Sequence, residues 1–396
     1  MRGRALEPIQ LRGIRLRNRF IKTATYEGMS PGGRVSDALV NHHAQMAANG
    51  VALTTVAYAA VSPDGRTFSE QLLVDRDNVP GLRRLTDAVH GHGGLASLQL
   101  GHCGGFSKNK EVTGGRPAGP SAAWNTYGLL VGVPRIRAMT VDELAEIPDQ
   151  FAQAARLAQE AGFDAVEIHC GHGYLLSQFL SPAVNRRKDA WGGSLEGRAK
   201  LALAVIEAVR EAVGPSMPIL AKLNTRDGVP GGQEMEETVQ IAQWLVDAGV
   251  DCIVPSGGLV ARSAFFLMRG RVPVSDMVRA EKHPAQRWAI RLFAPLVMKP
   301  YAYTSNFFLE DAARIAEAVD VPVALLGGVD SAAAVTEAME RGFSFVAMGR
   351  ALLADPDFIP RFTQGEAIVS RCTHCNACVG EMDMGGVRCV LEPRSA

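Results

Sequence analysis

The 396-residue sequence predicts an α/β fold, a (β/α)8 TIM barrel with long capping loops and a C-terminal cysteine-rich tail. The first observation is that eight short runs suit buried parallel strands. These runs are Phe20–Thr25, Val51–Ala57, Leu95–Leu100, Asp164–His169, Pro218–Asn224, Asp251–Ser256, Val321–Gly327 and Ser344–Gly349. The second is that helical patterns follow most of them, at Asp37–Ala48, Gly81–His92, Val141–Ala161, Leu195–Val213, Glu234–Ala248, Glu310–Val319, Ser331–Arg341 and Ala351–Phe362.

Two connections between these units are long, and both follow strands. Gly101–Thr140 is rich in glycine and proline, and Gly257–Phe308 includes a helical patch around Ala285–Phe293. Loops of this length are usually functional or carry structure of their own, so we expect both to overhang the mouth of the barrel. We expect residues 1–365 to form the barrel and residues 366–396 to form a cysteine-rich segment packed on it.

Bulk composition favours a cytoplasmic enzyme. The chain carries 41 basic and 41 acidic residues, so its charge gives no reason to expect a nucleic acid or an anionic membrane as partner. The N-terminal stretch has no apolar signal-peptide core, and no apolar run approaches the roughly 20 residues of a membrane helix. Seven cysteines in such a protein argue against a disulfide framework.

The run Ala165–Ile168 is the strand that carries the most chemistry at its end. His169, His172 and Tyr174 follow it directly, so two imidazoles and a phenol should reach the same small volume at the barrel mouth. Together they offer hydrogen-bond donors and a proton source. Any one of them alone would fit a satisfied loop or core position, but three at one strand end indicate a catalytic site.

These residues open a longer motif. H-x-x-H-G-Y-L-L-S-Q-F-L-S-P is followed by N-R-R-x-D-x-W-G-G-S-L-E-x-R from Asn185 to Arg198. The motif resembles the old yellow enzyme family of FMN-dependent ene-reductases. More narrowly, it resembles the bacterial NADH:flavin oxidoreductase branch, which includes the barrel domains of 2,4-dienoyl-CoA reductase and trimethylamine dehydrogenase. The resemblance runs from Leu16 to Pro393.

The resemblance implies a flavin site at the ends of the first, third and fifth strands. Ala24 and Thr25 would place backbone groups against the ring, and the Gln99 amide would bond its pyrimidine edge. Lys222 would place a cation beside flavin N1 and O2, although an ion pair with a neighbouring strand is the alternative. Tyr26 stands where relatives often carry cysteine, so the FMN should be non-covalent.

The last two strands end in glycine, as a phosphate site requires. Gly327 and Gly328 end the seventh strand, and Gly349 and Arg350 end the eighth. Backbone N–H groups at helix starts bind anions, and barrels favour a phosphate after these strands. The four residues therefore match the FMN-phosphate cradle of the family. Aromatic side chains at Tyr26, Tyr58 and Trp124 are candidate walls of the pocket, with Tyr58 against the cofactor.

The parts imply reduction of FMN by NADH or NADPH, followed by hydride transfer to the C=C bond of an α,β-unsaturated carbonyl. His169 and His172 would hold the carbonyl oxygen and Tyr174 would protonate the α-carbon. The alternative is an oxidative dehydrogenase, for amines or other substrates, that passes electrons from FMN through a [4Fe–4S] cluster to a partner protein. A small-molecule substrate is expected in both cases, and the sequence leaves a homo-oligomer open.

The tail holds four cysteines in a regular spacing, Cys372-x₂-Cys375-x₂-Cys378-x₁₀-Cys389. Thiolates at this spacing suit a [4Fe–4S] cluster, and the segment resembles the cluster loop of trimethylamine dehydrogenase and dienoyl-CoA reductase. Zinc also binds four cysteines, and a tail that keeps its thiols without metal is the third alternative. His374 within the motif is expected to be a loop residue rather than a ligand.

Overall fold

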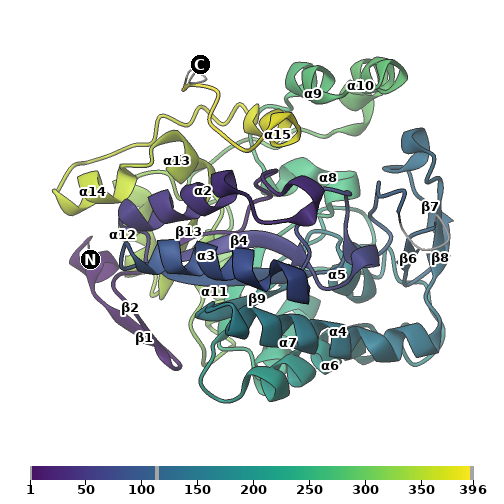
Figure 1. Cartoon of the computed structure of the whole chain (residues 1–396), viewed down its shortest axis with the longest axis horizontal. Helices are drawn as coiled ribbons and strands as arrows, with labels where there is room; N and C mark the ends of the chain where they lie inside the picture. Colours follow the sequence, from purple (N-terminus) through teal and green to yellow (C-terminus); the bar gives the residue numbers. More distant parts are fainter. Residues whose placement is uncertain (1, 112–115, 393–396) are drawn as a thin grey trace.

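A computed structural model describes residues 2–111 and 116–392, and its centre is a closed barrel of eight parallel strands (Figure 1). The strands are β3 (Phe20–Lys22), β4 (Leu53–Ala60), β5 (Leu95–Gly101), β9 (Ala165–Cys170), β10 (Ile219–Asn224), β11 (Cys252–Ser256), β12 (Ala324–Leu326) and β13 (Phe345–Met348). Their hydrogen-bonded order runs β11-β10-β9-β5-β4-β3-β13-β12. A parallel bridge between Ile253 and Val323 closes the ring between the two end strands. The predicted barrel is confirmed, with every predicted strand in it.

Helices surround the barrel, and all of them except α5 fall within or overlap a predicted helical stretch. They are α2 (Asp37–Ala48), α3 (Val79–His90), α4 (Val141–Glu160), α5 (Leu175–Leu180), α6 (Leu195–Val213), α7 (Met235–Asp247), α11 (Leu309–Ala316), α12 (Ala332–Glu340), α13 (Arg350–Ala354) and α14 (Phe358–Thr363). The single helix predicted over Ala351–Phe362 was wrong, because the chain leaves helical geometry at Asp355, where φ is −132°. Asp355 precedes Pro356, and a residue before proline is biased away from the α region.

Side-chain alternation divides the strands into two layers. One face of each strand packs on the helices, as Phe20, Val166 and Ile253 do. The other face fills the barrel interior with a second apolar cluster. That cluster contains Ile21, Leu53, Ala165, Leu220, Cys252, Val254, Ala324, Leu326, Phe345 and Ala347 from the strands. The interior is therefore a packed core, and only its upper layer is left for chemistry.

An N-terminal hairpin contributes to the interior cluster. After the short helix α1 (Arg2–Leu6), strands β1 (Ile9–Leu11) and β2 (Ile14–Leu16) pair antiparallel. Leu11 and Leu16 are almost fully buried and belong to the interior cluster. The turn comes close to the chain at Ser216, where a Cβ on Gly13 would lie 2.3 Å from the carbonyl oxygen. The sequence analysis missed this hairpin.

The two long connections fold into structure of their own. The first holds a small sheet of β6 (Ala118–Gly119), β7 (Ala123–Trp124) and β8 (Arg135–Ala138). The second holds α8 (Val260–Leu267), α9 (Val274–Ala280) and α10 (Pro284–Val297), of which α9 and α10 stand at the upper edge of Figure 1. Short 3-10 turns complete the chain at Pro31–Gly33, Pro63–Gly65, Arg76–Asn78, Leu129–Val131 and Met382–Met384.

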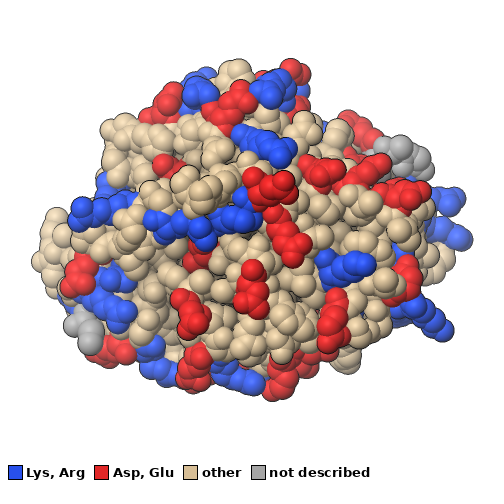
Figure 2. Space-filling model, turned by 90° about the horizontal axis from the view of Figure 1, so that it is seen from below, with Lys and Arg blue, Asp and Glu red and all other residues tan. Residues whose placement is uncertain are grey.

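The surface mixes charges of both signs. On the face shown in Figure 2, basic and acidic side chains alternate across the molecule, in keeping with the balanced composition. Among the described residues, no helix combines the length and the hydropathy that crossing a bilayer requires.

The described part of the C-terminal segment packs on the barrel. Val369 forms an antiparallel bridge with Ser331 at the start of α12, and the Val387 N–H donates to the Glu27 carbonyl at 2.7 Å. Arg371 pairs with the buried carboxylate of Asp355 at 2.6 Å. The helix α15 (Cys378–Glu381) lies on α9. Pro393, the last residue of the family resemblance, lies outside the described residues together with residues 394–396.

Leu16→Ala tests the hairpin as part of the core. Leu16 is fully buried in the interior cluster, so truncation should lower the free energy of unfolding by about 2–5 kcal/mol. Urea unfolding followed by circular dichroism measures this. Leu129, which is 49% exposed, provides the matched control, and Leu129→Ala should have almost no effect. Equal effects of the two substitutions would show that the hairpin is not part of the core.

Candidate active site

A cavity of about 280 Å³ opens at the C-terminal ends of the barrel strands. Every residue that the sequence analysis assigned to cofactor or catalysis lines it: Ala24, Thr25, Tyr58, Gln99, His169, His172, Tyr174, Lys222, Gly327, Gly328, Gly349 and Arg350. These residues come from seven of the eight strand ends. Such convergence of distant positions on one cavity is expected for the active site of a barrel enzyme.

Strand alternation explains why the polar residues meet. Ala165 and Leu220 point into the apolar interior, so the residues two positions later, Glu167 and Lys222, point the same way one layer higher. His169 belongs to the same face of β9 as Glu167. Because side chains two positions apart on a strand share a face, these polar side chains form a layer directly above the apolar one.

Lys222 is held by an ion pair inside the barrel. Its ammonium lies 2.9 Å from Glu167 Oε1 and donates to Thr23 Oγ1 at 2.9 Å. The Gln99 amide nitrogen donates to the same Glu167 oxygen at 2.6 Å. The ion pair that the sequence analysis left open is thus present, and Lys222 lines the cavity as well. One of its three protons and the Gln99 carbonyl oxygen remain available to a ligand.

Two imidazoles and a phenol gather beside this pair, as predicted. The ring centroids of His169 and His172 are 4.9 Å apart, and those of His169 and Tyr174 are 4.6 Å apart. His169 Nδ1 accepts from the Gly171 N–H at 3.3 Å, so the proton of a neutral His169 ring sits on Nε2. Both imidazoles are buried and the Tyr174 side chain is half-buried, and all three line the cavity and can donate hydrogen bonds into it.

His172 adopts a backbone conformation that is uncommon outside glycine. Its φ is +62°, and the strain is offset by three contacts. The N–H donates to Asn224 Oδ1 at 2.9 Å, the carbonyl accepts from Val260 N, and Nε2 lies 2.7 Å from Ser256 Oγ. The sequence analysis missed Ser256, although it ends a predicted strand at the same rim.

Burial fixes the protonation states of these groups. Desolvation lowers the pKa of His172 to about 3, and desolvation together with the neighbouring His172 and Lys222 lowers the pKa of His169 well below its ordinary value. Both imidazoles are therefore neutral near pH 7. Burial raises the pKa of the Tyr174 phenol above its ordinary value, so it keeps its proton. His169, His172 and Tyr174 therefore offer neutral hydrogen-bond donors, beside the Lys222 cation.

Aromatic side chains form one wall of the cavity. The Tyr58 and Tyr174 rings meet edge to face with centroids 4.8 Å apart. The Tyr58 hydroxyl turns away and bonds Thr67 Oγ1 at 2.6 Å, so Tyr58 contributes a ring face and not a donor. Tyr26 also lines the cavity, as predicted. Trp124 does not: it is 65% exposed on β7, and its assignment as a pocket wall was wrong.

Close packing and a left-handed backbone require the two glycines after β12. Gly327 and Gly328 have φ of +106° and +90°, and a Cβ on Gly327 would lie 2.5 Å from the Phe308 ring. Arg350 starts α13, and its guanidinium bonds the Arg269 carbonyl at 2.9 Å and the Asn376 side chain. Arg350 thus joins the barrel end to the cysteine segment.

The donor set fits FMN. A flavin offers adjacent C=O and N–H groups to an amide such as Gln99 and a carbonyl edge to a cation such as Lys222. The cavity continues to the glycines at β12 and β13, where a phosphate is expected in barrels. Bound FMN supplies a hydride donor and acceptor at N5.

The four cysteines of the tail surround a second, small cavity. Cys372, Cys375, Cys378 and Cys389 all line it, and all are free thiols. Among the described residues, no three of these sulfurs lie within 4.8 Å of one another, whereas tetrahedral zinc would bring them to about 3.8 Å. The His374 ring stacks on Tyr303, and its Nε2 lies 3.3 Å from Asp330 Oδ2. Its imidazole therefore interacts with these two residues rather than with the thiols.

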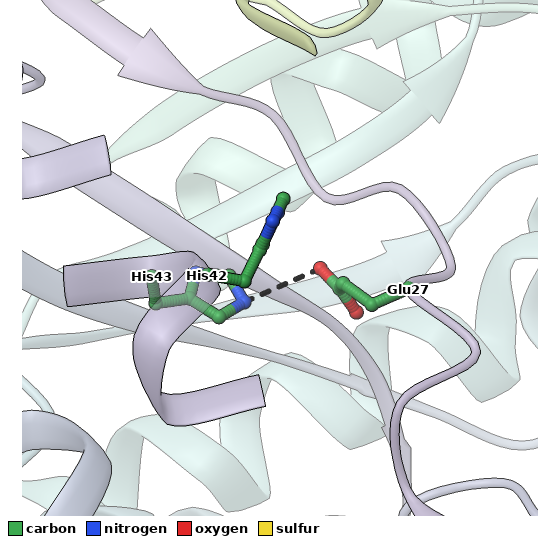
Figure 3. A group of neighbouring side chains, drawn as sticks. All are labelled: Glu27, His42 and His43. Atoms are coloured by element: carbon green, nitrogen blue, oxygen red, sulfur yellow. Dashed lines mark ion pairs between the residues drawn. The ribbon is translucent and has the colours of Figure 1, made fainter. Parts of the chain in front are cut away.

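A buried charged network lies beside the loop that follows β3 and carries Ala24 and Thr25 (Figure 3). Glu27 accepts from the Lys22 ammonium at 2.6 Å and from the Ala57 N–H at 3.1 Å, and His43 Nε2 lies 3.3 Å away. His42 completes a trio that could ligate a metal. A cation there would have to displace Lys22 from the same carboxylate oxygen, so the network serves to hold the loop that carries Ala24 and Thr25.

The architecture and the polar layer define a flavin-dependent oxidoreductase. Residues 5–264 match the model of the NADH:flavin oxidoreductase / NADH oxidase family, and the chain belongs to that family. It is 41% identical over 391 residues to 4,4'-dithiodibutanoate disulfide reductase of Rhodococcus erythropolis, covering 97% of this chain and 94% of the relative. The chain is an FMN-dependent enzyme that uses NADH or NADPH, as predicted.

Two other similar proteins are longer than this chain. A metal reductase of Desulforamulus reducens is 32% identical over 93% of this chain, which covers 50% of the relative. The solved 2-naphthoyl-CoA reductase superposes with a TM-score of 0.82 at 22% identity, covering all of this chain and 57% of that one. The chain thus spans about half the length of both, and the second likeness is one of fold.

Glu27→Gln tests the buried network. Burial alone would raise the pKa of Glu27, but Lys22 and His43 lower it to about 2. The variant leaves the Lys22 ammonium buried without its counter-ion, so the free energy of unfolding at pH 7 should fall by roughly 3–5 kcal/mol.

The pH dependence gives a second measurement. The folded-state pKa lies below the unfolded value of about 4.5, so this contribution is present above that pH and is lost as pH falls toward 2. Urea unfolding should show a difference between wild type and Glu27→Gln that shrinks below about pH 4.5. The exposed Glu310→Gln variant should match wild type, and a pH-independent difference would contradict the assignment.

Proposed function

We propose that the chain is an NAD(P)H-dependent ene-reductase that acts on α,β-unsaturated carbonyl compounds. The observation that carries the proposal is the meeting of His169, His172 and Tyr174 in the cavity whose floor holds Lys222 and Gln99. Neutral imidazoles can donate hydrogen bonds to the carbonyl oxygen of a substrate, and a protonated phenol beside them can donate a proton to its α-carbon.

Each of these residues would have its own role in the reaction. His169 Nε2–H and a ring N–H of His172 donate to the carbonyl oxygen of the substrate and stabilise negative charge as it develops there. A hydride reaches the β-carbon, and the Tyr174 hydroxyl gives its proton to the α-carbon, so that the C=C bond becomes CH–CH. Solvent returns the proton to Tyr174. Ser256, bonded to His172 Nε2, holds that ring in position.

Reduction of a small disulfide is the second candidate. It is favoured by the relative that reduces 4,4'-dithiodibutanoate and matches almost the whole of this chain. Two electrons and two protons convert a disulfide to two thiols, and the same imidazole donors would stabilise the departing thiolate. An oxidative dehydrogenase with a [4Fe–4S] cluster is the third candidate. It is favoured by the four cysteines that line one small cavity.

A panel of electron acceptors separates the three. The FMN-loaded protein is reduced anaerobically with NADH or NADPH and then mixed with 2-cyclohexen-1-one, 4,4'-dithiodibutanoate or ferricyanide. We expect fast reoxidation by the enone with formation of cyclohexanone. Reoxidation by the disulfide alone would favour the second candidate. Reoxidation by ferricyanide alone, with stoichiometric iron and acid-labile sulfide, would favour the third.

Tyr174→Phe tests the proton donor. The variant keeps the ring contacts and loses only the hydroxyl, so reduction by NAD(P)H and ligand binding should remain close to wild type. Reoxidation by an enone should slow by about 10²–10⁴-fold, because general acid catalysis is lost. A quinone, whose oxygens take protons from water, serves as control and should react unchanged in stopped-flow measurements. Equal slowing with both oxidants would make Tyr174 a packing residue.

A further inference from the structure

Helix α10 exposes an unusual amount of apolar surface. Ten large apolar side chains stand exposed in the described residues, and five of them lie on this helix. We call these five the apolar ridge: Trp288, Leu292, Phe293, Leu296 and Val297, which are 46–81% exposed. Only Gln286 and Ala294 of α10 are buried. Figure 1 shows α10 at the upper edge of the molecule, beside α9.

The chain itself gives this helix little support. A 14-residue helix is marginally stable alone, and Pro295 removes one of its hydrogen bonds. Helices in proteins are stabilised mainly by packing an apolar face, but here the apolar face points outward. A second surface is therefore needed to cover the apolar ridge.

We propose that the apolar ridge is the self-association surface of a two-fold symmetric dimer, in which α10 packs antiparallel on α10 of a second copy. Trp288, Leu292 and Leu296 follow the i, i+4, i+8 row that interdigitates when two helices pack. The row is symmetric about Leu292. An antiparallel copy therefore sets Trp288 of one chain against Leu296 of the other, as an isologous interface requires.

The exposed area matches the need of a dimer. With typical side-chain areas, the five exposed fractions amount to roughly 500 Å² of apolar surface. A standard interface buries about 800 Å² on each partner, of which roughly 60% is apolar. The apolar ridge thus supplies the apolar centre of one such interface.

The charges around the apolar ridge give the dimer a distinctive salt dependence. Lys282, Arg287, Arg291 and Lys299 are exposed, and residues 282–309 contain no aspartate or glutamate. Within the described chain, none of the four is in an ion pair. Across a two-fold axis these cations repel, so salt should strengthen the dimer. An acidic partner protein or an anionic lipid surface would instead be released by salt.

The dimer would also steady the active site. Helix α10 lies in the connection whose first part places Leu267 and Met268 at the cavity and whose last part places Tyr303 and Phe307 there. Covering α10 restrains the middle of this segment, and so both of its ends.

Sedimentation velocity of the FMN-loaded full chain tests the proposal. At tens of micromolar we expect twice the 42.3 kDa mass of the chain, and a dissociation constant that falls as NaCl is added. Leu292→Glu should raise the dissociation constant by about 100-fold, because it places a charge at the centre of the interface. Leu129→Glu, of nearly equal exposure at 49% against 46%, is the control and should dimerise like wild type.

Several results would overturn the proposal. They are a monomeric wild type at the highest concentration, a dimer that survives Leu292→Glu, equal loss in Leu129→Glu, and a dimer that dissociates as salt rises. Circular dichroism checks that Leu292→Glu is folded. If it is not, hydrogen exchange of the wild type decides: amides of α10 must become protected as the concentration rises, and unchanged exchange would refute the dimer.

Discussion

The polar layer of the barrel depends on one buried ion pair, Glu167 with Lys222. An ammonium inside a barrel would be costly without a counter-charge, and Glu167 supplies it at 2.9 Å. The same carboxylate oxygen accepts from Gln99, so one residue sets the position of both polar groups on the cavity floor. A change that removed Glu167 would therefore disturb two strands at once. The imidazoles above the pair remain neutral because they are themselves buried and because the Lys222 ammonium disfavours a second positive charge beside it.

Much of this was readable from the sequence because it depends on local periodicity. Parallel strands buried on both faces leave short apolar runs, and those runs place His169, Gln99 and Lys222 at strand ends without further information. Where periodicity is broken by a single residue, the prediction failed locally. Pro356 divides a helix that the apolar pattern alone joins, and Ile9–Leu16 is too short a pattern to be distinguished from a loop.

The rest depends on contacts between residues distant in sequence. Glu167 stood within a predicted strand, but nothing in its neighbours indicates that Lys222, 55 residues later, lies beside it. Ser256 and His172 are 84 residues apart and meet only because β9 and β11 flank the same strand, β10. Trp124 gives the opposite lesson. An aromatic residue in a loop after a strand can line the cavity or be exposed to solvent. The small sheet formed by that loop determines which of the two occurs, and the sequence does not reveal it.

Arg350 lies between the two cavities, and this has a consequence for redox chemistry. It lines the large cavity and the small cysteine cavity together with Leu353, Cys372 and Cys378. A single guanidinium therefore contributes positive potential to both places. Its charge opposes the rise that burial imposes on the pKa of Cys372 and Cys378. An electron or anion added in one cavity would therefore change the electrostatic potential in the other. The two cavities are separate spaces, but they are electrostatically coupled through Arg350.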